Sequence, residues 1–152
     1  MTFPGTSIAY GYKTGYVYDP LNNLATVNQG AQTRSFTYSS LSRLLSAQNP
    51  ESGTILYAYD PNGNLTSKKD ARNITTAYTY DALNRVTMRS YDDNATLPVY
   101  YTYDNLSHAK GKLTKVTTGS GTTPFSVTEY TEFDAVGRVK KSRQTTDGNG
   151  VQ

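Results

Sequence analysis

The single histidine of the chain, His108, is its only side chain that ordinarily exchanges protons near neutral pH. Serine and aspartate are abundant, so a Ser-His-Asp arrangement is formally available, but no spacing in the sequence fixes a nucleophile beside His108. The histidine lies in a turn-like stretch, YDNLSHAKGKL, where an exposed side chain is the ordinary outcome. The sequence therefore predicts no catalytic residue, and we expect that the protein is not an enzyme.

Two glycine-containing acidic stretches are similar to calcium-binding loops, DPNGN at 60–64 and DGNG at 147–150. In the first, glycine stands at the wrong position and Ala71 takes the place of the bidentate glutamate, so a turn is the better interpretation. The chain has no cysteine, which excludes disulfides and thiolate zinc sites. Phosphate-binding glycine loops are also absent from the sequence. We expect no metal site and no cofactor.

The sequence also contains candidate glycosylation sites and two basic segments. Four Asn-x-Ser/Thr sequons are candidate glycosylation sites: Asn64, Asn73, Asn94 and Asn105. The net charge of +3 is modest, and basic residues gather in HAKGKLTK (108–115) and GRVKKSR (137–143), which could contact phosphate or an acidic glycan. We favour solvated strand faces that discourage edge pairing, and we do not expect a nucleic-acid partner.

The elements that must position these residues repeat along the chain. An aromatic residue followed by a short turn occurs six times, at intervals of 20, 21, 21, 23 and 30 residues. The six aromatic residues are Tyr18, Tyr38, Tyr59, Tyr80, Tyr103 and Phe133. Five of them follow another aromatic residue by two positions, which places both rings on one face of a strand. A unit that returns at a nearly fixed interval indicates architecture, because a catalytic site is normally built once.

Each copy also carries the chemistry of a hairpin turn. In five copies an aspartate follows the aromatic residue, and in the second copy Ser39 takes its place. Both residue types suit the first position of a type I turn. The aspartates are Asp19, Asp60, Asp81, Asp104 and Asp134. Three residues after this position stands a residue that tolerates the left-handed conformation of a three-residue hairpin loop with a bulge. These residues are Asn22, Ser42, Gly63, Asn84, Ser107 and Gly137.

This turn fixes the strand register. It predicts that Tyr80 pairs with Val86 and Tyr59 with Leu65, and that Asp81 and Asp134 close their loops against Arg85 and Arg138. An aromatic–aliphatic pair contributes up to about 1 kcal/mol. An exposed Asp–Arg pair contributes a few tenths of a kcal/mol. The aromatic face is therefore expected to be the buried one.

Weaker turn signals lie between the hairpins, at 28–31, 50–53, 70–73 and 92–95. Each unit is then strand, tight turn, strand, looser turn, which gives about twelve strands. The 14 tyrosines, the absence of tryptophan and the hydrophobic content of 36% favour half-buried sheet faces over a dry interior. We predict an all-β fold: a ribbon of consecutive antiparallel β-hairpins, about 20 to 21 residues each, that forms a curved or spiralling sheet.

This pattern resembles the YD-repeat family, also called Rhs repeats, with YDALNRV (80–86), FDAVGRV (133–139) and YDPNGNL (59–65) as the best matches. The resemblance implies a hairpin ribbon that spirals into a shell or barrel. In bacterial Rhs proteins and insecticidal toxin complexes that shell encloses a toxin domain, and in the animal teneurins a similar barrel belongs to an adhesion receptor. Related cell-wall-associated proteins have been linked to carbohydrate binding.

The resemblance also sets expectations for domain organisation, partners and location. We expect residues 1–152 to form one array of about six repeats, over 16–143, that is a fragment of or related to a longer repeat protein. Expected partners are other YD repeats of the same or neighbouring chains, an enclosed toxin domain, or glycans. A secreted or cell-surface location is implied, although no signal peptide is visible and no membrane span is expected.

Two functions follow from these expectations. The first is a non-catalytic structural segment that builds a β-sheet shell or scaffold. The alternative is a module that assembles edge to edge or binds carbohydrate in adhesion. Individual features are expected at the lengthened turn of the fifth copy and at 117–130, which we interpret as an added loop.

Overall fold

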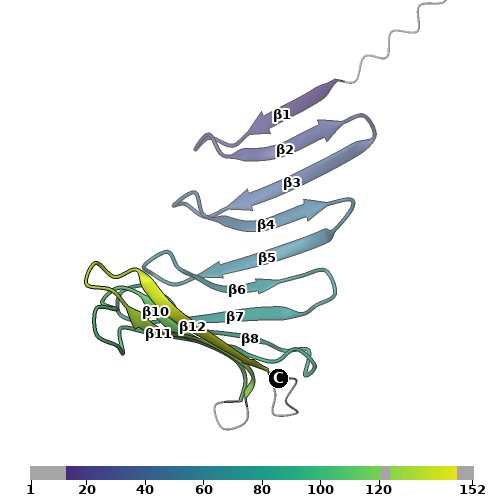
Figure 1. Ribbon diagram of the computed structural model, residues 1–152. Helices are drawn as coiled ribbons and strands as arrows, with labels where there is room; N and C mark the ends of the chain where they lie inside the picture. Colours follow the sequence, from purple (N-terminus) through teal and green to yellow (C-terminus); the bar gives the residue numbers. More distant parts are fainter. Residues whose placement is uncertain (1–12, 121–123, 147–152) are drawn as a thin grey trace, which may run out of the picture. The chain divides into compact units, whose positions relative to one another are not determined.

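The computed structural model describes residues 13–120 and 124–146, and every helix or strand within them is a β-strand (Figure 1). The strands are β1 (Thr14–Tyr18), β2 (Leu24–Gln29), β3 (Gln32–Tyr38), β4 (Leu44–Asn49), β5 (Gly53–Tyr59), β6 (Leu65–Lys69), β7 (Thr75–Tyr80), β8 (Val86–Tyr91), β9 (Val99–Tyr103), β10 (Leu113–Gly119), β11 (Pro124–Phe133) and β12 (Val139–Thr146). Strand order in the sheet follows chain order. The predicted all-β ribbon of antiparallel hairpins is confirmed.

The chain divides into two compact units, Met1–Leu56 and Tyr57–Gln152. The boundary falls inside β5. The first unit contains β1 to β4 and the start of β5, and the second contains the end of β5 and β6 to β12. The predicted curvature of the whole ribbon stays a prediction.

The predicted register of the YD hairpins is present in both units. Tyr18 pairs with Leu24 and Tyr38 with Leu44 in the first unit, while Tyr80 pairs with Val86 in the second. Phe133 pairs with Val139 in the same way. The hydrophobic ring of each YD motif therefore lies opposite the aliphatic residue that follows its turn.

Each of these hairpins also contains a β-bulge, next to the aromatic–aliphatic pair. In the fourth copy Thr79 pairs with Met88 and Tyr80 with Val86, so Thr87 is an extra residue on β8. Ala25, Leu45 and Lys140 are extra in the same position of other copies. A bulge increases local twist and shifts the side-chain alternation by one residue. The two residues that lie opposite the two rings of a copy are therefore three positions apart instead of two. In the fourth copy, Val86 lies opposite Tyr80 and Arg89 lies opposite Tyr78.

The turns between repeats are tighter than the sequence predicts. Gln29 pairs with Gln32 across a two-residue turn, and Asn49 pairs with Gly53 across three residues. The 70–74 turn repeats the YD geometry: Asp70 donates its N–H to the Ile74 carbonyl at 3.0 Å, and Asn73 is left-handed at φ 66. The prediction of looser turns is wrong for these three. Among the described turns between repeats, it holds for the longer connection between Tyr91 and Val99.

The expected loop at 117–130 is mostly strand. Residues up to Gly119 belong to β10, and residues from Pro124 belong to β11, which is ten residues long. The pairing of these strands runs from Lys115 opposite Glu129 to Gly119 opposite Pro124. The loop prediction is wrong because threonine and valine in this stretch favour extended backbone, which lengthens the hairpin instead of its loop.

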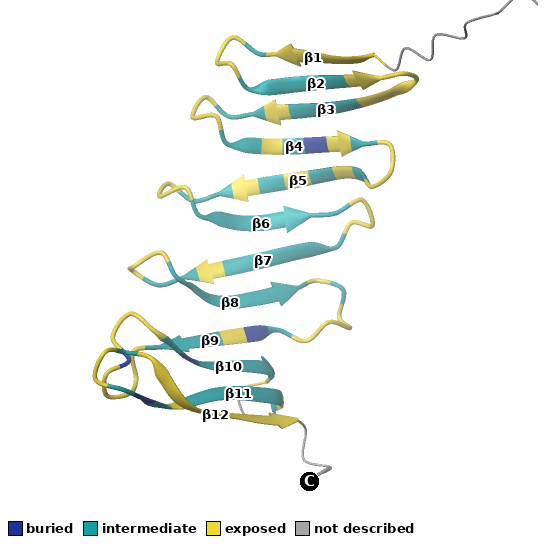
Figure 2. Ribbon diagram, turned by 45° about the horizontal axis from the view of Figure 1, so that its top comes forward, coloured by how far each residue is buried: buried dark blue, intermediate teal, exposed yellow. Residues whose placement is uncertain are grey.

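Few of the described residues are fully buried (Figure 2). Most of the described tyrosines are half-buried. Within the described residues the buried apolar side chains are Ala47, Val99, Ala109 and Phe133. Tyr16 and Tyr18 on β1 are 58% and 55% exposed, so the expected burial of the aromatic face is wrong for the first copy. No described helix is long and apolar enough to cross a membrane.

Candidate functional site

The aspartate of each YD motif organises its turn from within. Asp81 donates its backbone N–H to the Arg85 carbonyl, and its carbonyl accepts the Asn84 N–H, both at 3.0 Å. Its side-chain Oδ1 accepts the N–H groups of Leu83 and Arg85 at 2.9 and 3.0 Å. These hydrogen bonds, with the Arg85 backbone N–H first among them, lower the pKa of Asp81 below its usual value. The Asp81 carboxylate thus makes its hydrogen bonds within its own turn.

Asp134 and Asp60 make equivalent contacts. The Asp134 Oδ1 accepts the backbone N–H groups of Val136 and Arg138, and the Asp60 Oδ1 accepts that of Asn64. The predicted left-handed residues Asn22, Ser42, Gly63, Asn84 and Gly137 have φ angles of 64, 57, 91, 59 and 78°. The turn prediction is confirmed at these five positions.

The residue after the left-handed position binds the second oxygen of the same carboxylate. The Arg85 and Arg138 side chains reach Oδ2 of Asp81 and Asp134 at 2.7 Å, as expected from the sequence. Asn64 does the same toward Asp60 with its amide at 2.9 Å, as does Asn23 toward Asp19 at 3.0 Å. Asn and Arg therefore play the same role at this position, as side-chain donors to the second carboxylate oxygen. The sequence predicts this role only for the arginines, although the asparagines align with them.

In three copies the tyrosine hydroxyl of the motif links its hairpin to the one before it. Tyr80 donates its hydroxyl to the Leu65 carbonyl at 2.8 Å, and Tyr103 donates to the Val86 carbonyl at 2.9 Å. In the first unit, Tyr38 donates to the Leu24 carbonyl at 3.1 Å. Burial raises the pKa of both Tyr80 and Tyr103, which keeps each phenol in its donor form. The motif tyrosine thus supplies both packing area and a bond between repeats.

Arg85 joins the fourth and fifth copies. Its guanidinium binds Asp81 at 2.7 Å and Asp104 at 2.7 Å, and its carbon Cζ lies 4.4 Å from the centre of the Tyr103 ring. The Arg85 side chain lowers the pKa of Asp104. Arg85 therefore bridges the carboxylates of two neighbouring YD turns.

The fifth turn departs from the common geometry. Asp104, His108 and Gly111 are the left-handed residues here, so the prediction that Ser107 takes this conformation is wrong. Asp104 donates its backbone N–H to the Lys112 carbonyl at 3.2 Å, and its side chain accepts the Gly111 N–H at 2.5 Å. The added residues fold inward at Ala109, which is fully buried, whereas His108 is exposed. The exposed-turn interpretation of His108 is confirmed.

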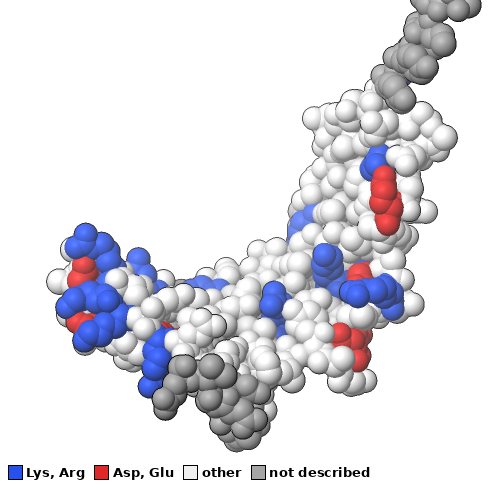
Figure 3. Space-filling view, turned by 45° about the vertical axis from the view of Figure 1, so that its right-hand side comes forward, with Lys and Arg blue, Asp and Glu red and all other residues white. Residues whose placement is uncertain are grey.

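The two lysine-rich segments of the sequence lie next to each other. A Cβ placed on Gly137 would lie 3.2 Å from the Lys112 Cε and 3.3 Å from the His108 carbonyl oxygen. The widened fifth turn therefore packs against the sixth. Figure 3 shows a dense group of Lys and Arg side chains in one region of the surface, with acidic side chains set among them.

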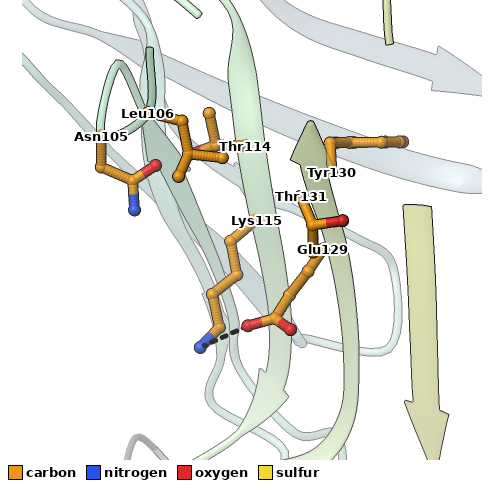
Figure 4. Close-up of a pocket in the computed structure, with 7 residues that line it drawn as sticks. All are labelled: Asn105, Leu106, Thr114, Lys115, Glu129, Tyr130 and Thr131. Atoms are coloured by element: carbon orange, nitrogen blue, oxygen red, sulfur yellow. Dashed lines mark ion pairs between the residues drawn. The ribbon is translucent and has the colours of Figure 1, made fainter. Parts of the chain in front are cut away.

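A pocket of about 150 Å³ lies beside the widened turn (Figure 4). Its lining residues are Asn105, Leu106, Thr114, Lys115, Glu129, Tyr130 and Thr131. Pairing between β10 and β11 ends at Lys115 opposite Glu129, and the pocket lies where the two strands separate. Lys115 and Glu129 form an ion pair at 3.4 Å, so the two charges offset each other. The pocket presents mixed polar groups but no uncompensated charge of its own.

No group of three or more His, Asp or Glu side chains that could hold a metal occurs in residues 13–120 and 124–146. The DPNGN stretch is the Asp60 turn, as interpreted from the sequence, and DGNG at 147–150 lies outside the described residues.

The four sequons differ in their surroundings. Asn73, Asn94 and Asn105 are exposed, and Asn73 and Asn94 are left-handed turn residues. The Asn64 amide donates to both Asp60 and Asn84, at 2.9 and 2.8 Å. A glycan on that nitrogen would interfere with both contacts, so the three exposed sites are the better acceptors. Glycosylation stays a prediction.

Comparison with known families matches residues 59–96 to the family described as RHS Repeat. This confirms the YD-repeat, or Rhs-repeat, resemblance. Comparison with curated proteins gives no match.

Several solved structures share the fold. The crystal structure of TcdB2-TccC3 without its hypervariable C-terminal region has a TM-score of 0.63 at 18% identity, and the match covers 86% of this chain and 8% of that one. The crystal structure of TcdB2-TccC3-TEV has a TM-score of 0.61 at 17% identity, with 86% and 8% covered. A variant of the Photorhabdus luminescens Tc holotoxin pore has a TM-score of 0.58 at 16% identity, with 89% and 9% covered. The chain thus spans less than a tenth of the length of these proteins.

Proposed function

Because the chain carries RHS repeats, we propose that it is a non-catalytic structural segment that builds part of a β-sheet shell or scaffold. The observation that carries this proposal is the use of the motif side chains. Asp81 and Arg85 close a turn, and Tyr80 bonds to the preceding hairpin, so these groups serve the sheet itself. A substrate would find none of these polar groups free to act on it.

The fold likeness to Tc toxin structures supports the shell role at the level of architecture. As part of a longer protein, the segment would surround a toxin domain together with further YD repeats, in a secreted or cell-surface setting. Protease protection tests this in the full open reading frame that contains the chain. The enclosed domain should resist protease, and Asp81→Ala with Tyr80→Phe should expose it. A domain that is equally sensitive with and without these substitutions would refute enclosure.

The non-catalytic part of the proposal rests on His108 being exposed in a turn. The expected result is that His108→Ala leaves any hydrolytic activity of the purified protein at its background level. An activity that disappears with this single substitution would overturn the structural interpretation.

Edge-to-edge assembly is the second candidate, and β1 favours it. This strand is the first of the sheet within the described residues, it carries no charge, and all five of its residues are exposed. An uncharged exposed edge is a template for pairing with another strand. Sedimentation velocity over a range of concentrations separates the candidates: a monomer throughout supports the scaffold role alone, and growing oligomers support assembly.

Carbohydrate binding by the exposed rings of Tyr16 and Tyr18 remains a prediction. A glycan array tests it, with Tyr16→Ala as the variant that should lose any signal. No signal on the array would remove this alternative.

A further inference from the structure

The sixth YD copy lacks one of its two rings. Where the other five copies have an aromatic residue two positions before the motif ring, this copy has Thr131. Thr131 is also an extra residue on β11, since Tyr130 pairs with Ser142 and Glu132 with Lys141. The hairpins β1–β2, β3–β4 and β7–β8 have no bulge at this position. The sixth copy therefore departs from the repeat at Thr131 in both its side chain and its backbone.

The pocket beside the widened fifth turn lies at this departure (Figure 4). Thr131 lines it from β11, while Asn105 and Leu106 line it from the turn. A threonine leaves free the volume that the ring of the other copies takes up. The pocket is thus built by two departures from the repeat, the widened turn of the fifth copy and the missing ring of the sixth.

A loose ion pair supplies the charges of the pocket. The Lys115 Nζ lies 3.4 Å from the Glu129 Oε1, which is longer than the roughly 2.7 to 2.9 Å of a strong charge-assisted hydrogen bond. Glu129 has its closer partner in Arg143, at 2.6 Å from Oε2. The hydrogen bonds from Arg143, the larger cause, and from Lys115 lower the pKa of Glu129, so its carboxylate is ionised near neutral pH. Both side chains that line the pocket are partly exposed, at 39% for Lys115 and 23% for Glu129.

The two opposite charges restrict the kind of ligand that fits. An anion near Lys115 would also lie beside the Glu129 carboxylate, and a cation near Glu129 would lie beside the Lys115 ammonium. A ligand that carries both charges avoids this repulsion, because each of its charges can face the opposite one. Standard bond lengths place the nitrogen of an α-amino acid roughly 3 Å from its carboxylate oxygens. This separation is close to the 3.4 Å between the Lys115 Nζ and the Glu129 Oε1.

We propose that this pocket binds a free α-amino acid with a small side chain, whose carboxylate contacts Lys115 and whose ammonium contacts Glu129. Binding exchanges one loose ion pair for two new contacts, and it leaves the pair of Glu129 with Arg143 in place. The Asn105 amide and the Thr131 hydroxyl offer further hydrogen bonds. The inference goes beyond a structural role for the chain and does not depend on it, because it follows from the pocket alone.

The size and the walls of the pocket agree with this ligand. A cavity of about 150 Å³ holds a benzene molecule, which has as many non-hydrogen atoms as alanine, and this pocket has about the same volume. Leu106 offers apolar surface for a small side chain. Figure 4 shows the Lys115 and Glu129 side chains meeting at their charged ends, with the Tyr130 ring directed away from them. A neutral polyol would therefore find no ring to stack on near the ion pair, and its hydrogen bonds are weaker than those of a charged ligand.

The test titrates the full chain with L-alanine, propionate, ethylammonium and glycerol at constant ionic strength, followed by amide NMR of the nitrogen-labelled protein. L-alanine should shift the amide resonances of Lys115, Glu129 and Thr131 in a saturable way. Propionate lacks the ammonium and ethylammonium lacks the carboxylate, so each should bind roughly threefold to tenfold more weakly. Glycerol, which carries no charge, should bind more weakly than L-alanine as well.

Matched variants locate the site. Lys115→Gln should remove the preference for L-alanine over ethylammonium, and Glu129→Gln should remove its preference over propionate. Thr131→Tyr restores the ring of the other copies and should block the pocket. Lys141→Gln is the control, because Lys141 is ion-paired with Glu132 and does not line the pocket.

Circular dichroism checks that each variant keeps its fold. The proposal is overturned if L-alanine gives no saturable shift, or if propionate or glycerol binds as tightly as L-alanine. It is also overturned if L-alanine binding is unchanged in folded Lys115→Gln and Thr131→Tyr.

Discussion

The hydroxyl of Tyr80 donates a 2.8 Å hydrogen bond to the backbone carbonyl of Leu65, one repeat earlier in the chain. The same bond recurs from Tyr103 to Val86 and, in the first unit, from Tyr38 to Leu24. The tyrosine of the YD motif is therefore a connector between hairpins, and its phenol distinguishes it from the phenylalanine that replaces it in the sixth copy.

Tyr80→Phe keeps the ring but leaves the Leu65 carbonyl without this donor. We expect a loss of about 0.5 to 1.5 kcal/mol in the free energy of unfolding. Chemical denaturation followed by circular dichroism measures it. Tyr100→Phe is the control, because Tyr100 is exposed. Equal effects of the two substitutions would show that the hydroxyl bond contributes nothing specific.

Arg85→Ala removes a guanidinium that binds two carboxylates and covers the Tyr103 ring. We expect it to cost about 1 to 2 kcal/mol, because the side chain is largely buried and makes several contacts at once. Arg138→Ala should cost less than about 0.5 kcal/mol. That arginine holds the same motif position, but its side chain is 80% exposed and its ion pair is with Asp134. If thermal unfolding showed the two variants to be equivalent, the joining role of Arg85 would be wrong.

Gly137→Ala should be more destabilising than Gly111→Ala. Both glycines are left-handed, with φ of 78 and 77°, so a side chain costs each about 1 to 2 kcal/mol. A Cβ on Gly137 also meets the His108 carbonyl oxygen at 3.3 Å, whereas none of the neighbouring atoms lies within 4 Å of a Cβ on Gly111. The extra loss, measured by urea denaturation, reports the packing of the fifth turn on the sixth. Equal losses of unfolding free energy in the two variants would mean that the fifth turn moves away from a Cβ on Gly137 at no cost.

Acid should weaken the C-terminal hairpin of β11 and β12. In the folded chain the pKa of Glu132 is lowered from 4.5 to about 2 by Lys140 and Lys141. A folded-state pKa below the unfolded one means that this stabilisation is present above pH 4.5 and is lost as the pH falls toward 2. The Tm should therefore drop across this window at low salt. Glu132→Gln should drop less steeply, and a slope unchanged in that variant would contradict the assignment.

The turns could be predicted from sequence because their chemistry is local. Asn84 and Gly63 tolerate the left-handed conformation, and Asp81 supplies the oxygen that accepts the loop N–H groups, so a few consecutive residues determine the whole loop. The 70–74 turn carries the same local signal, because Asp70 and Asn73 have the spacing of Asp81 and Asn84. It lacks only the aromatic residue of the repeat, since Lys69 stands in that place.

The contacts between repeats could not be predicted in the same way. Whether Arg85 binds one carboxylate or two depends on how far apart neighbouring turns lie, which no single repeat determines. The bulge at Thr87 and the hydroxyl bond of Tyr80 depend on the twist between strands for the same reason. The inward fold of the fifth turn at Ala109 follows from packing against the sixth turn.

The tyrosine bonds described above run only to the hairpin immediately before, and few side chains are buried deeply enough to join more distant ones. Stability in such a chain is close to a sum over neighbouring pairs. A complete hairpin unit can then be duplicated or lost during evolution, provided that the register of one new junction is kept. The length of the ribbon is free to change while the unit that builds it remains the same.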